Sequence, residues 1–364
     1  MPPDPAEGLA LIKASVREQP PYTLAAPPAT RKLNQNESPF DFPPELKREV
    51  LERISTQPWQ RYPEFAPPDL LSQLAAHYGW VADGVLVGNG SNELIQATLA
   101  VALRAGDAVV APSPTFSLYR LLTAVHGGCY LPVPLRTGYI FDVDALIDTA
   151  RRGAARVVVL NSPNNPTGSA LPAGAVSRIL NETDALVVCD EAYQEFGGPS
   201  AIELLAHSSR LVVLRTFSKA LGLAGLRFGL ALAHPAVARE IAKAKLPYNV
   251  NLVTLTAART ALRHASLLVA RAHEVIEIRD RFVARLKELP GLTVYPTAAN
   301  FVLVRSSGLP AKQLFRHLLD DYGILIRDVS DSAQLSECLR ISIGTSEDMD
   351  VVISALQEIL GHER

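Results

Sequence analysis

The chain has 364 residues, of which 48% are hydrophobic and 20% charged, and its formal net charge at pH 7 is -2. This length exceeds what one hydrophobic core usually needs, so we expect two domains, or one large domain with a smaller satellite. The balanced charge excludes the basic surface of a nucleic-acid-binding protein and an acidic tail, and it favours a small-molecule partner.

The N-terminal half begins with an irregular stretch and continues with an alternating pattern. Residues 1–32 are rich in proline and predict an ordered arm or linker that is too short to fold alone. Short β-branched runs then alternate with longer helical patterns up to about residue 233. The predicted strands are 85–87, 108–111, 156–160, 186–188, 211–214 and 229–232. This alternation predicts an α/β domain with a mostly parallel sheet covered by helices.

The pattern changes after Pro247. Two amphipathic stretches predict helices near 252–263 and 266–289, and Pro290 and Gly291 end the second. Further strands are predicted at 292–295, 301–304, 324–326 and 339–343, with helices at 311–321 and 346–360. We therefore expect an arm at 1–32, a large domain at 33–248 and a smaller α+β domain at 249–364.

Several other classes of protein are not expected from this sequence, namely disulfide-bonded, metal-binding, secreted and membrane proteins. Cys129, Cys189 and Cys338 are far apart and form no paired motif, which argues against a disulfide framework or a zinc knuckle. The histidines show no pair at ligand spacing, so no metal site is expected. Residues 1–7 do not resemble a signal peptide, and no apolar run reaches the roughly 20 residues of a membrane span. A cytoplasmic protein with no membrane partner is the expectation.

Lys219 is the most informative single residue. It follows the apolar run 210–215, which predicts a buried strand, and ligands bind at strand ends in α/β sheets. Burial and the nearby Arg227 would both favour the uncharged amine, which can condense with an aldehyde. A lone lysine is more often a solvated surface charge. The residues at the other strand ends are what favour chemistry here.

Two further strand ends carry groups that suit an aromatic ring. Asp190 follows the predicted strand 186–188 and would suit a protonated pyridine nitrogen, although an aspartate that caps a helix is the simpler interpretation. Asn165 and Tyr193 could both donate to a phenolate oxygen on such a ring. The turn chemistry of residues 161–168 would equally explain Asn165.

A third group of residues suits an anion. Gly90, Ser91 and Asn92 lie between a predicted strand and an apolar helix, so backbone amides and the helix dipole would face a phosphate. Ser218 and Arg227 could add a hydroxyl and a charged fork. The Gly-Ser turn is weak by itself, because such turns are common.

These motifs together resemble the fold-type-I family of pyridoxal-phosphate enzymes, the aspartate-aminotransferase-like class I and II aminotransferases. The resemblance rests on 162–168, 190–193, 218–220 and 225–227, and it runs from about Leu33 to the end of the chain. It implies a large α/β domain with a mostly parallel seven-stranded sheet between helices, and a smaller α+β domain. It implies pyridoxal phosphate as cofactor, with Phe116 stacked on the pyridine ring. It also implies a homodimer, in which Tyr62 reaches the cofactor phosphate of the neighbouring subunit.

Within this family the chain is most similar to the aminotransferases of histidinol phosphate, through residues 33–39, 61–64, 215–220 and 338–341. That similarity implies transamination between histidinol phosphate, a phosphorylated amino alcohol, and glutamate or 2-oxoglutarate in histidine biosynthesis. Arg340 would bind the substrate carboxylate, and Arg327, helped by Tyr22, the substrate phosphate. Asn36 would line the substrate entrance. A surface cation and a packed arm residue are the competing interpretations of Arg327 and Tyr22.

The resemblance also implies roles and leaves alternatives. Lys219 would anchor the cofactor and carry the proton, Asp190 would keep the ring nitrogen protonated, and Tyr193 would assist. An aromatic aminotransferase or a threonine-phosphate decarboxylase on the same scaffold remains open, because the bond that breaks depends on substrate orientation. A pyridoxal-phosphate-sensing regulator is remote, since residues 1–32 cannot supply a DNA-binding domain.

Overall fold

Seven strands form one sheet in the computed structural model of this chain, which describes residues 5–20 and 27–361. Their order is β2-β8-β7-β6-β5-β3-β4, and all neighbours are parallel except β8, which is antiparallel to β2 and β7. The bounds are β2 Val85–Asn89, β3 Ala108–Ser113, β4 Cys129–Pro134, β5 Val157–Asn161, β6 Leu186–Asp190, β7 Leu211–Thr216 and β8 Phe228–Ala233. The mostly parallel sheet expected from the sequence is confirmed.

One strand of this sheet was absent from the predicted set. β4 contains Pro132 and Pro134, which weaken a strand pattern because proline cannot donate to the ladder. It lies at the edge of the sheet, where it pairs only with β3 and where proline is tolerated. The sequence pattern of this sheet therefore fails at an edge strand, whose position permits it to be irregular.

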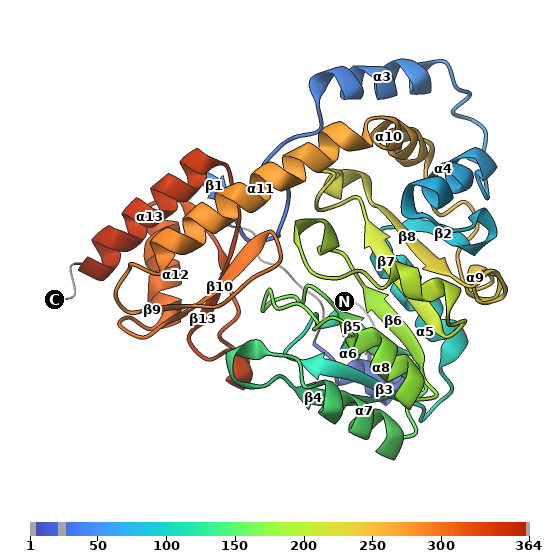
Figure 1. Cartoon of the computed structure of the whole chain (residues 1–364), viewed down its shortest axis with the longest axis horizontal. Helices are drawn as coiled ribbons and strands as arrows, with labels where there is room; N and C mark the ends of the chain where they lie inside the picture. Colours follow the sequence, from blue (N-terminus) through green and yellow to red (C-terminus); the bar gives the residue numbers. More distant parts are fainter. Residues whose placement is uncertain (1–4, 21–26, 362–364) are drawn as a thin grey trace.

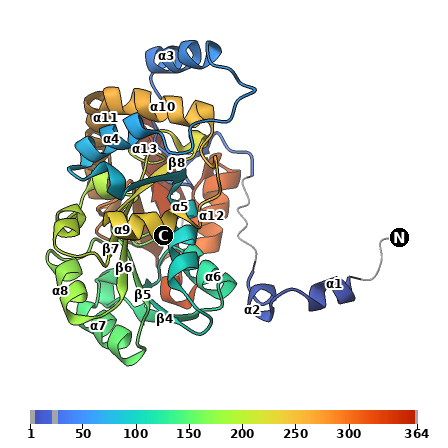
Figure 2. The ribbon, with the colours of Figure 1, turned by 90° about the vertical axis from the view of Figure 1, so that its right-hand side faces the viewer.

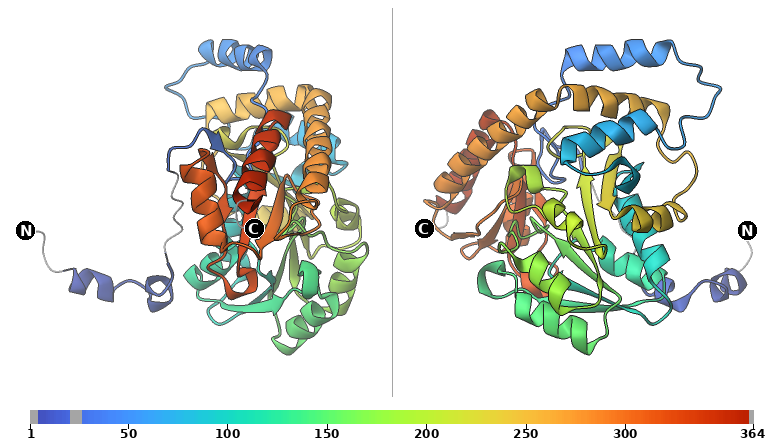
Figure 3. Two further views of the ribbon diagram at one scale, coloured as in Figure 1. Left: turned by 90° about the vertical axis from the view of Figure 1, so that its left-hand side faces the viewer. Right: turned by 45° about the vertical axis from the view of Figure 1, so that its right-hand side comes forward.

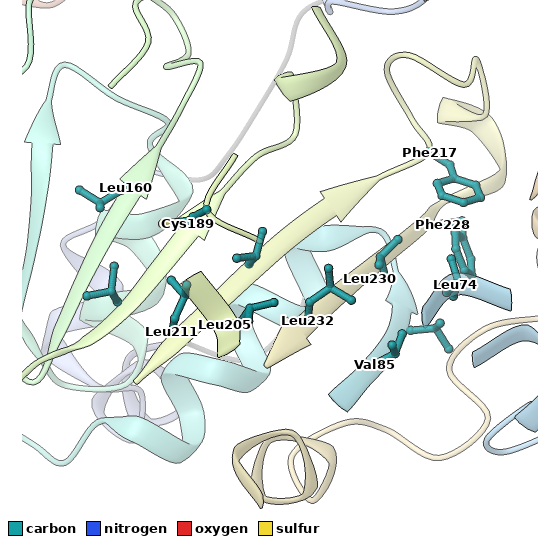
Figure 4. Close-up of a cluster of buried hydrophobic side chains, with 14 of the residues drawn as sticks. Leu74, Val85, Leu160, Cys189, Leu205, Leu211, Phe217, Phe228, Leu230 and Leu232 are labelled. Carbon is teal, nitrogen blue, oxygen red and sulfur yellow. The ribbon is translucent and has the colours of Figure 1, made fainter. Parts of the chain in front are cut away.

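Helices cover both faces of the sheet (Figure 1). In β5, Val157 and Val159 pack into one core and Val158 and Leu160 into the other, because successive side chains of a strand point to opposite faces. The first core contains α5 (Ser91–Ala102), α6 (Leu118–Val125) and α9 (Pro235–Ala242). The second contains α3 (Pro44–Ser55), α4 (Pro68–Tyr78), α7 (Val143–Arg152), α8 (Ala175–Glu182) and α10 (Leu252–Arg263). Figure 4 shows side chains of this second core lying against the strands.

Strand polarity gathers distant segments at one edge of the sheet. β5, β6 and β7 all end there, and Asn161 is the register partner of Asp190. β2 ends at the same edge, with Asn89 opposite Phe228. Because β8 runs the other way, it begins at this edge, and Arg227 immediately precedes it. Residues that follow four strands and one that precedes a fifth can therefore meet.

The smaller domain contains a second, antiparallel sheet in the order β12-β13-β10-β9. Its strands are β9 Leu292–Val294, β10 Phe301–Ser306, β12 Arg327–Asp328 and β13 Cys338–Ser342. The helices α11 (Ala265–Leu286), α12 (Ala311–Asp320) and α13 (Ser346–Gly361) pack with it around one core. The strand predicted at 324–326 corresponds to β11 (Ile324–Leu325), which pairs with β1 (Arg31–Lys32). β12 begins just after it and pairs with β13, and neither β1 nor β12 was among the predicted strands.

The two cores meet along α11, the long helix that crosses between the domains in Figure 1. Leu268, near its start, belongs to the core of the large domain, as do the buried residues of α10. Ala272 and the following buried residues of α11 belong to the core of the smaller domain. We therefore propose a boundary inside α11, between Leu268 and Ala272, in place of the boundary at residue 248.

The first described residues form two short helices, α1 (Ala6–Ala10) and α2 (Ala14–Arg17), which extend from the body in Figures 2 and 3. α2 is tied to the end of α6, where Ser15 Oγ donates to the Ala124 carbonyl and Lys13 Nζ to the Val125 carbonyl, each at 3.0 Å. Among residues 5–20 and 27–361, no helix has the length and apolar character needed to cross a membrane.

Candidate active site

A cavity of about 1440 Å³ opens at the edge where β5, β6 and β7 end. Both domains contribute to its walls, together with residues 34–37. The predicted site residues that line it are Asn36, Ser91, Asn92, Phe116, Asn165, Asp190, Tyr193, Ser218, Lys219, Arg227, Arg327 and Arg340. Topology thus brings together side chains that are spread over most of the sequence.

Lys219 lies three residues beyond β7. Its Nζ donates to the Gln35 carbonyl oxygen at 3.0 Å and lies 5.8 Å from the centre of the Tyr193 ring. Burial above all, and then the Arg340 and Arg227 guanidinium groups, lower the pKa of Lys219 from 10.5 to about 8. Roughly a tenth of the amine is then uncharged at pH 7, against about one part in three thousand for an ordinary lysine. The residue is a usable nucleophile and base at neutral pH.

Asp190, the last residue of β6, is 4% exposed and carries a carboxylate into the cavity wall. Its Oδ2 accepts from the Tyr119 hydroxyl at 2.7 Å and its Oδ1 from the Ala192 amide at 3.2 Å. Burial raises the pKa of Asp190, while the Tyr119 hydrogen bond lowers it. A cationic ligand atom beside this carboxylate would compensate for its burial.

Tyr119 is the functional candidate that sequence reasoning missed. It is fully buried on α6, and its ring meets that of Phe116 edge-to-face with the centroids 5.7 Å apart. Burial raises the pKa of its hydroxyl well above the ordinary value, so it remains a donor to Asp190. The spacing of three residues from Phe116, about one helical turn, was the available signal, but a tyrosine on an apolar helix face usually indicates core packing.

The start of α5 forms an anion-binding corner. Gly90 precedes it with a φ of 78°, a conformation that favours glycine, and a Cβ there would lie 2.5 Å from Arg227 Nη2, so the guanidinium would have to move. Arg227 Nη1 donates to Ser218 Oγ at 3.2 Å. Ser91 opens the helix, where unpaired amides and the dipole favour a negative group. Asn92 is exposed beside it.

Arg340 lies on β13 and is 7% exposed. Its Nη1 donates to Asn165 Oδ1 at 2.5 Å and its Nη2 to the Asn34 carbonyl at 2.7 Å. Asn165 is itself held by its backbone amide, which donates to Asn161 Oδ1 at 2.8 Å. The guanidinium is thus oriented by neutral oxygens, which an anionic substrate group can replace. Arg327 is the register partner of Arg340 on β12 and lines the same cavity.

A buried ion pair fixes the strand ends that carry Asp190 and Lys219. Arg215, on β7, lies 2.8 Å from the Glu191 carboxylate and 2.9 Å from the Glu195 carboxylate. The two glutamates flank Tyr193 in sequence, so one guanidinium holds the loop after β6 against the strand before Lys219. Burial raises the pKa of both glutamates, and Arg215 opposes this effect. Breaking such a pair leaves a buried charge uncompensated.

Of the predicted residues that the structure describes, Gly90 and Tyr62 do not line this cavity. Tyr62 is 80% exposed and stacks on Tyr248, with ring centroids 4.5 Å apart. Tyr22 lies outside the described residues. Within the described ranges, no group of three or more His, Cys, Asp and Glu side chains could hold a metal ion.

The polar groups of this cavity fit pyridoxal phosphate. A buried carboxylate at Asp190 suits a protonated ring nitrogen, the amine of Lys219 suits an aldehyde, and the amides at the start of α5 suit a phosphate. The close approach of Gly90 and Arg227 leaves the corner open for an anion without a side chain in its way. The carboxylate, the amine and the amides belong to one cavity, and a single phosphorylated aromatic aldehyde could bind all three.

Comparison with known proteins agrees with this geometry. The family described as aminotransferase class I and II matches residues 30–356. The histidinol-phosphate aminotransferase of Chlorobaculum tepidum is 37% identical over 90% of this chain and 94% of its own length. That of Prosthecochloris aestuarii is 36% identical over 96% of this chain and 98% of its own length.

Solved structures agree as well. The histidinol-phosphate aminotransferase from Sinorhizobium meliloti, in complex with pyridoxal-5'-phosphate, superposes with a TM-score of 0.87 at 27% identity, covering 98% of this chain and 99% of that one. The L-threonine-O-3-phosphate decarboxylase from Porphyromonas gingivalis has a TM-score of 0.77 at 24% identity, covering 91% of this chain and 99% of that one. The latter likeness concerns the fold alone.

Proposed function

This chain belongs to the class I and II aminotransferases, and from this premise we propose that it transfers an amino group between histidinol phosphate and 2-oxoglutarate with pyridoxal phosphate as cofactor. In the biosynthetic direction, imidazole acetol phosphate and glutamate give histidinol phosphate and 2-oxoglutarate. The observation that carries the proposal is Lys219, a lysine with a pKa of about 8 in the same cavity as Asp190 and Arg340.

Each part of the site has a task in this proposal. Bound pyridoxal phosphate supplies an electron sink for the negative charge left when the substrate carbon loses a proton. Lys219 anchors the cofactor, and its released amine moves that proton. Asp190 holds the ring nitrogen in its protonated form. Ser91, Ser218 and Arg227 bind the phosphate, Phe116 packs on the ring, and Asn165 and Tyr193 donate to the ring oxygen.

Two arginines divide the substrate side. Arg340 offers its guanidinium to the carboxylate of glutamate, and Arg327 to the phosphate of histidinol phosphate. Support comes from their register: they are partners on neighbouring antiparallel strands, so two anion-binding groups stand about 5 Å apart at the backbone. Tyr22 as helper of Arg327 and Asn36 at the entrance complete the proposal.

Arg327→Ala is expected to raise the KM for histidinol phosphate by roughly ten- to a hundredfold, because a charged hydrogen-bond donor to the phosphate is lost. The KM for glutamate should change far less. Steady-state kinetics with each substrate varied in turn measures both. Arg316→Ala, on the exposed face of α12, is the matched control and should leave both constants unchanged. Equal increases for the two substrates would refute the phosphate role of Arg327.

A substrate panel tests the proposed function itself. Purified protein loaded with pyridoxal phosphate should consume histidinol phosphate only when a 2-oxo acid is present. Phenylalanine transamination and carbon dioxide release from threonine phosphate should both be much slower. A preference for phenylalanine would favour the aromatic aminotransferase, and carbon dioxide release would favour the decarboxylase.

A homodimer and a cytoplasmic location are part of this proposal. Other exposed apolar side chains close to Tyr62 or Tyr248 in the sequence are Trp59 (73%), Phe65 (61%) and Leu246 (72%). Phe65 lies edge-to-face against Tyr248, which also stacks on Tyr62. Contiguous exposed aromatic surface of this kind is typical of an interface. In the proposed dimer, this surface faces the partner and Tyr62 reaches the partner's cofactor phosphate.

A further inference from the structure

Asn36 is held at four points, although it belongs to an irregular segment. It is 1% exposed and has a φ of 54°, a left-handed conformation that asparagine tolerates better than most residues. Its backbone amide donates to Ser342 Oγ at 2.8 Å, and its carbonyl accepts from Asn300 Nδ2 at 3.1 Å. Its side chain contacts Ser342 and Tyr193. Such complete fixation in strained backbone suggests a task beyond lining an entrance.

The hydrogen bonds of this network have a definite direction. A backbone N–H can only donate, so Ser342 Oγ accepts from Asn36, and its own proton goes to Asn36 Oδ1 at 3.0 Å. The amide oxygen of Asn36 therefore faces Ser342. Its Nδ2 faces Tyr193 and donates to the hydroxyl oxygen at 3.1 Å. Reversing the Asn36 side chain would take away the acceptor of the Ser342 hydroxyl proton, and a buried donor left without an acceptor costs about 1–3 kcal/mol.

Tyr193 is thereby restricted to one role. A phenol has a single proton, and an oxygen that accepts from Asn36 must donate that proton in another direction. Packing holds the hydroxyl oxygen in place beside Asn36, because the ring is 5% exposed and lies edge-to-face on Phe301, with centroids 5.2 Å apart. Tyr193 lines the cavity beside Lys219.

We infer that Asn36 and Ser342 are positioning residues that fix the direction in which Tyr193 donates its hydroxyl proton, so that Tyr193 serves the ring oxygen of the cofactor as a donor. The inference rests on the proposed function, because it needs that ring oxygen as the acceptor. Ser342, at the end of β13, makes the direction depend on the smaller domain, whose Ser342 amide also donates to the Leu33 carbonyl at 3.0 Å.

Asn36→Asp tests this inference, because it keeps the shape but leaves only acceptors, so Tyr193 would turn its proton toward residue 36. The readout is the pH midpoint of the visible absorption change of bound pyridoxal phosphate. Losing a donor makes the ring oxygen more basic, and the midpoint should rise. Tyr193→Phe should raise it too. In the Tyr193→Phe background, Asn36→Asp should raise the midpoint by a smaller amount, because only the effect of its charge remains. The two shifts should differ by at least about one pH unit.

Control variants distinguish the effects of added charge and of misfolding from the effect of the direction of the Tyr193 proton. Gln35→Glu adds the same charge to the same wall, and its shift should be equal in the two backgrounds. Ser342→Ala adds no charge and should shift the midpoint in the same direction by a smaller amount, and only when Tyr193 is present. The thermal unfolding midpoint of each apoprotein reports whether the variant folds. If Asn36→Asp does not fold, the shift of the pH midpoint in Ser342→Ala, with and without Tyr193, tests the inference.

The outcomes distinguish the inference from the proposed function. A wild-type protein without a visible absorption band on addition of pyridoxal phosphate would overturn the proposed function. A normal band, raised in midpoint by Tyr193→Phe, with shifts from Asn36→Asp and Ser342→Ala that are the same in both backgrounds, would overturn only the inference. Shifts that vanish or shrink without Tyr193 would support it.

Discussion

Lys219→Ala is expected to abolish transamination, with a loss of kcat on the order of 10⁴-fold or more, because one change removes both the covalent anchor and the base. The visible absorption band of the covalently held cofactor should disappear with it. Pyridoxal phosphate should still bind, more weakly, because the groups around Asp190 and the start of α5 remain. Absorption spectra and single-turnover kinetics on the same preparation measure these effects.

Two comparisons show that the loss is specific. Lys243→Ala removes an exposed lysine of the α9 end that pairs with Glu240, and it should leave kcat unchanged. A small primary amine in solution should restore part of the activity of Lys219→Ala, since the truncation leaves room for it. Lys219→Ala with a kcat within tenfold of the wild-type value would refute the role of Lys219 as anchor and base.

The same lysine makes a prediction about pH. Burial and the neighbouring arginines lower the pKa of Lys219 to about 8, so the uncharged amine increases with pH up to about 8 and is nearly constant above it. The rate at which the apoprotein captures pyridoxal phosphate covalently should therefore rise roughly tenfold per pH unit below this value and then level off. A rate that keeps rising to pH 10 would indicate an ordinary lysine.

The position of Lys219 could be predicted because the local sequence contains the necessary information. An unbroken apolar run indicates a buried strand, and a strand end in an α/β sheet indicates a ligand site. Asp190 was placed by the same argument. The prediction of a ligand site depended on finding both residues, since a single lysine or aspartate after a strand has simpler explanations.

Other parts of the site have no comparable local signal. Tyr119 and Asp190 are separated by 71 positions, and nothing near Tyr119 indicates its partner. Arg227 was expected at the anion-binding corner, but the antiparallel direction of β8, which brings it there, is not revealed by a run of apolar residues. Asn34 and Gln35 contact Arg340 and Lys219 through backbone carbonyls, so their side chains carry no information about these contacts.

Asp190→Asn is expected to lower kcat/KM on the order of 10³-fold, because asparagine keeps the shape of the side chain but has no charge to hold the ring nitrogen protonated. An electrostatic contribution of this size corresponds to about 4 kcal/mol of transition-state stabilisation. The affinity for pyridoxal phosphate, measured by equilibrium titration of the apoprotein, should fall as well. A kcat/KM within tenfold of the wild-type value would exclude Asp190 as the partner of the ring nitrogen.

Tyr119→Phe is the graded counterpart of Asp190→Asn, because it removes one hydrogen bond and leaves the charge. We expect a loss of roughly tenfold. The Tyr119 hydroxyl lowers the pKa of Asp190 against the effect of burial, so its removal should raise that pKa. The carboxylate would then be protonated sooner as pH falls, and the acid limb of kcat/KM should move to higher pH. Tyr322→Phe, in the smaller domain, should move nothing, and an unshifted acid limb in Tyr119→Phe would mean that Tyr119 only fills space.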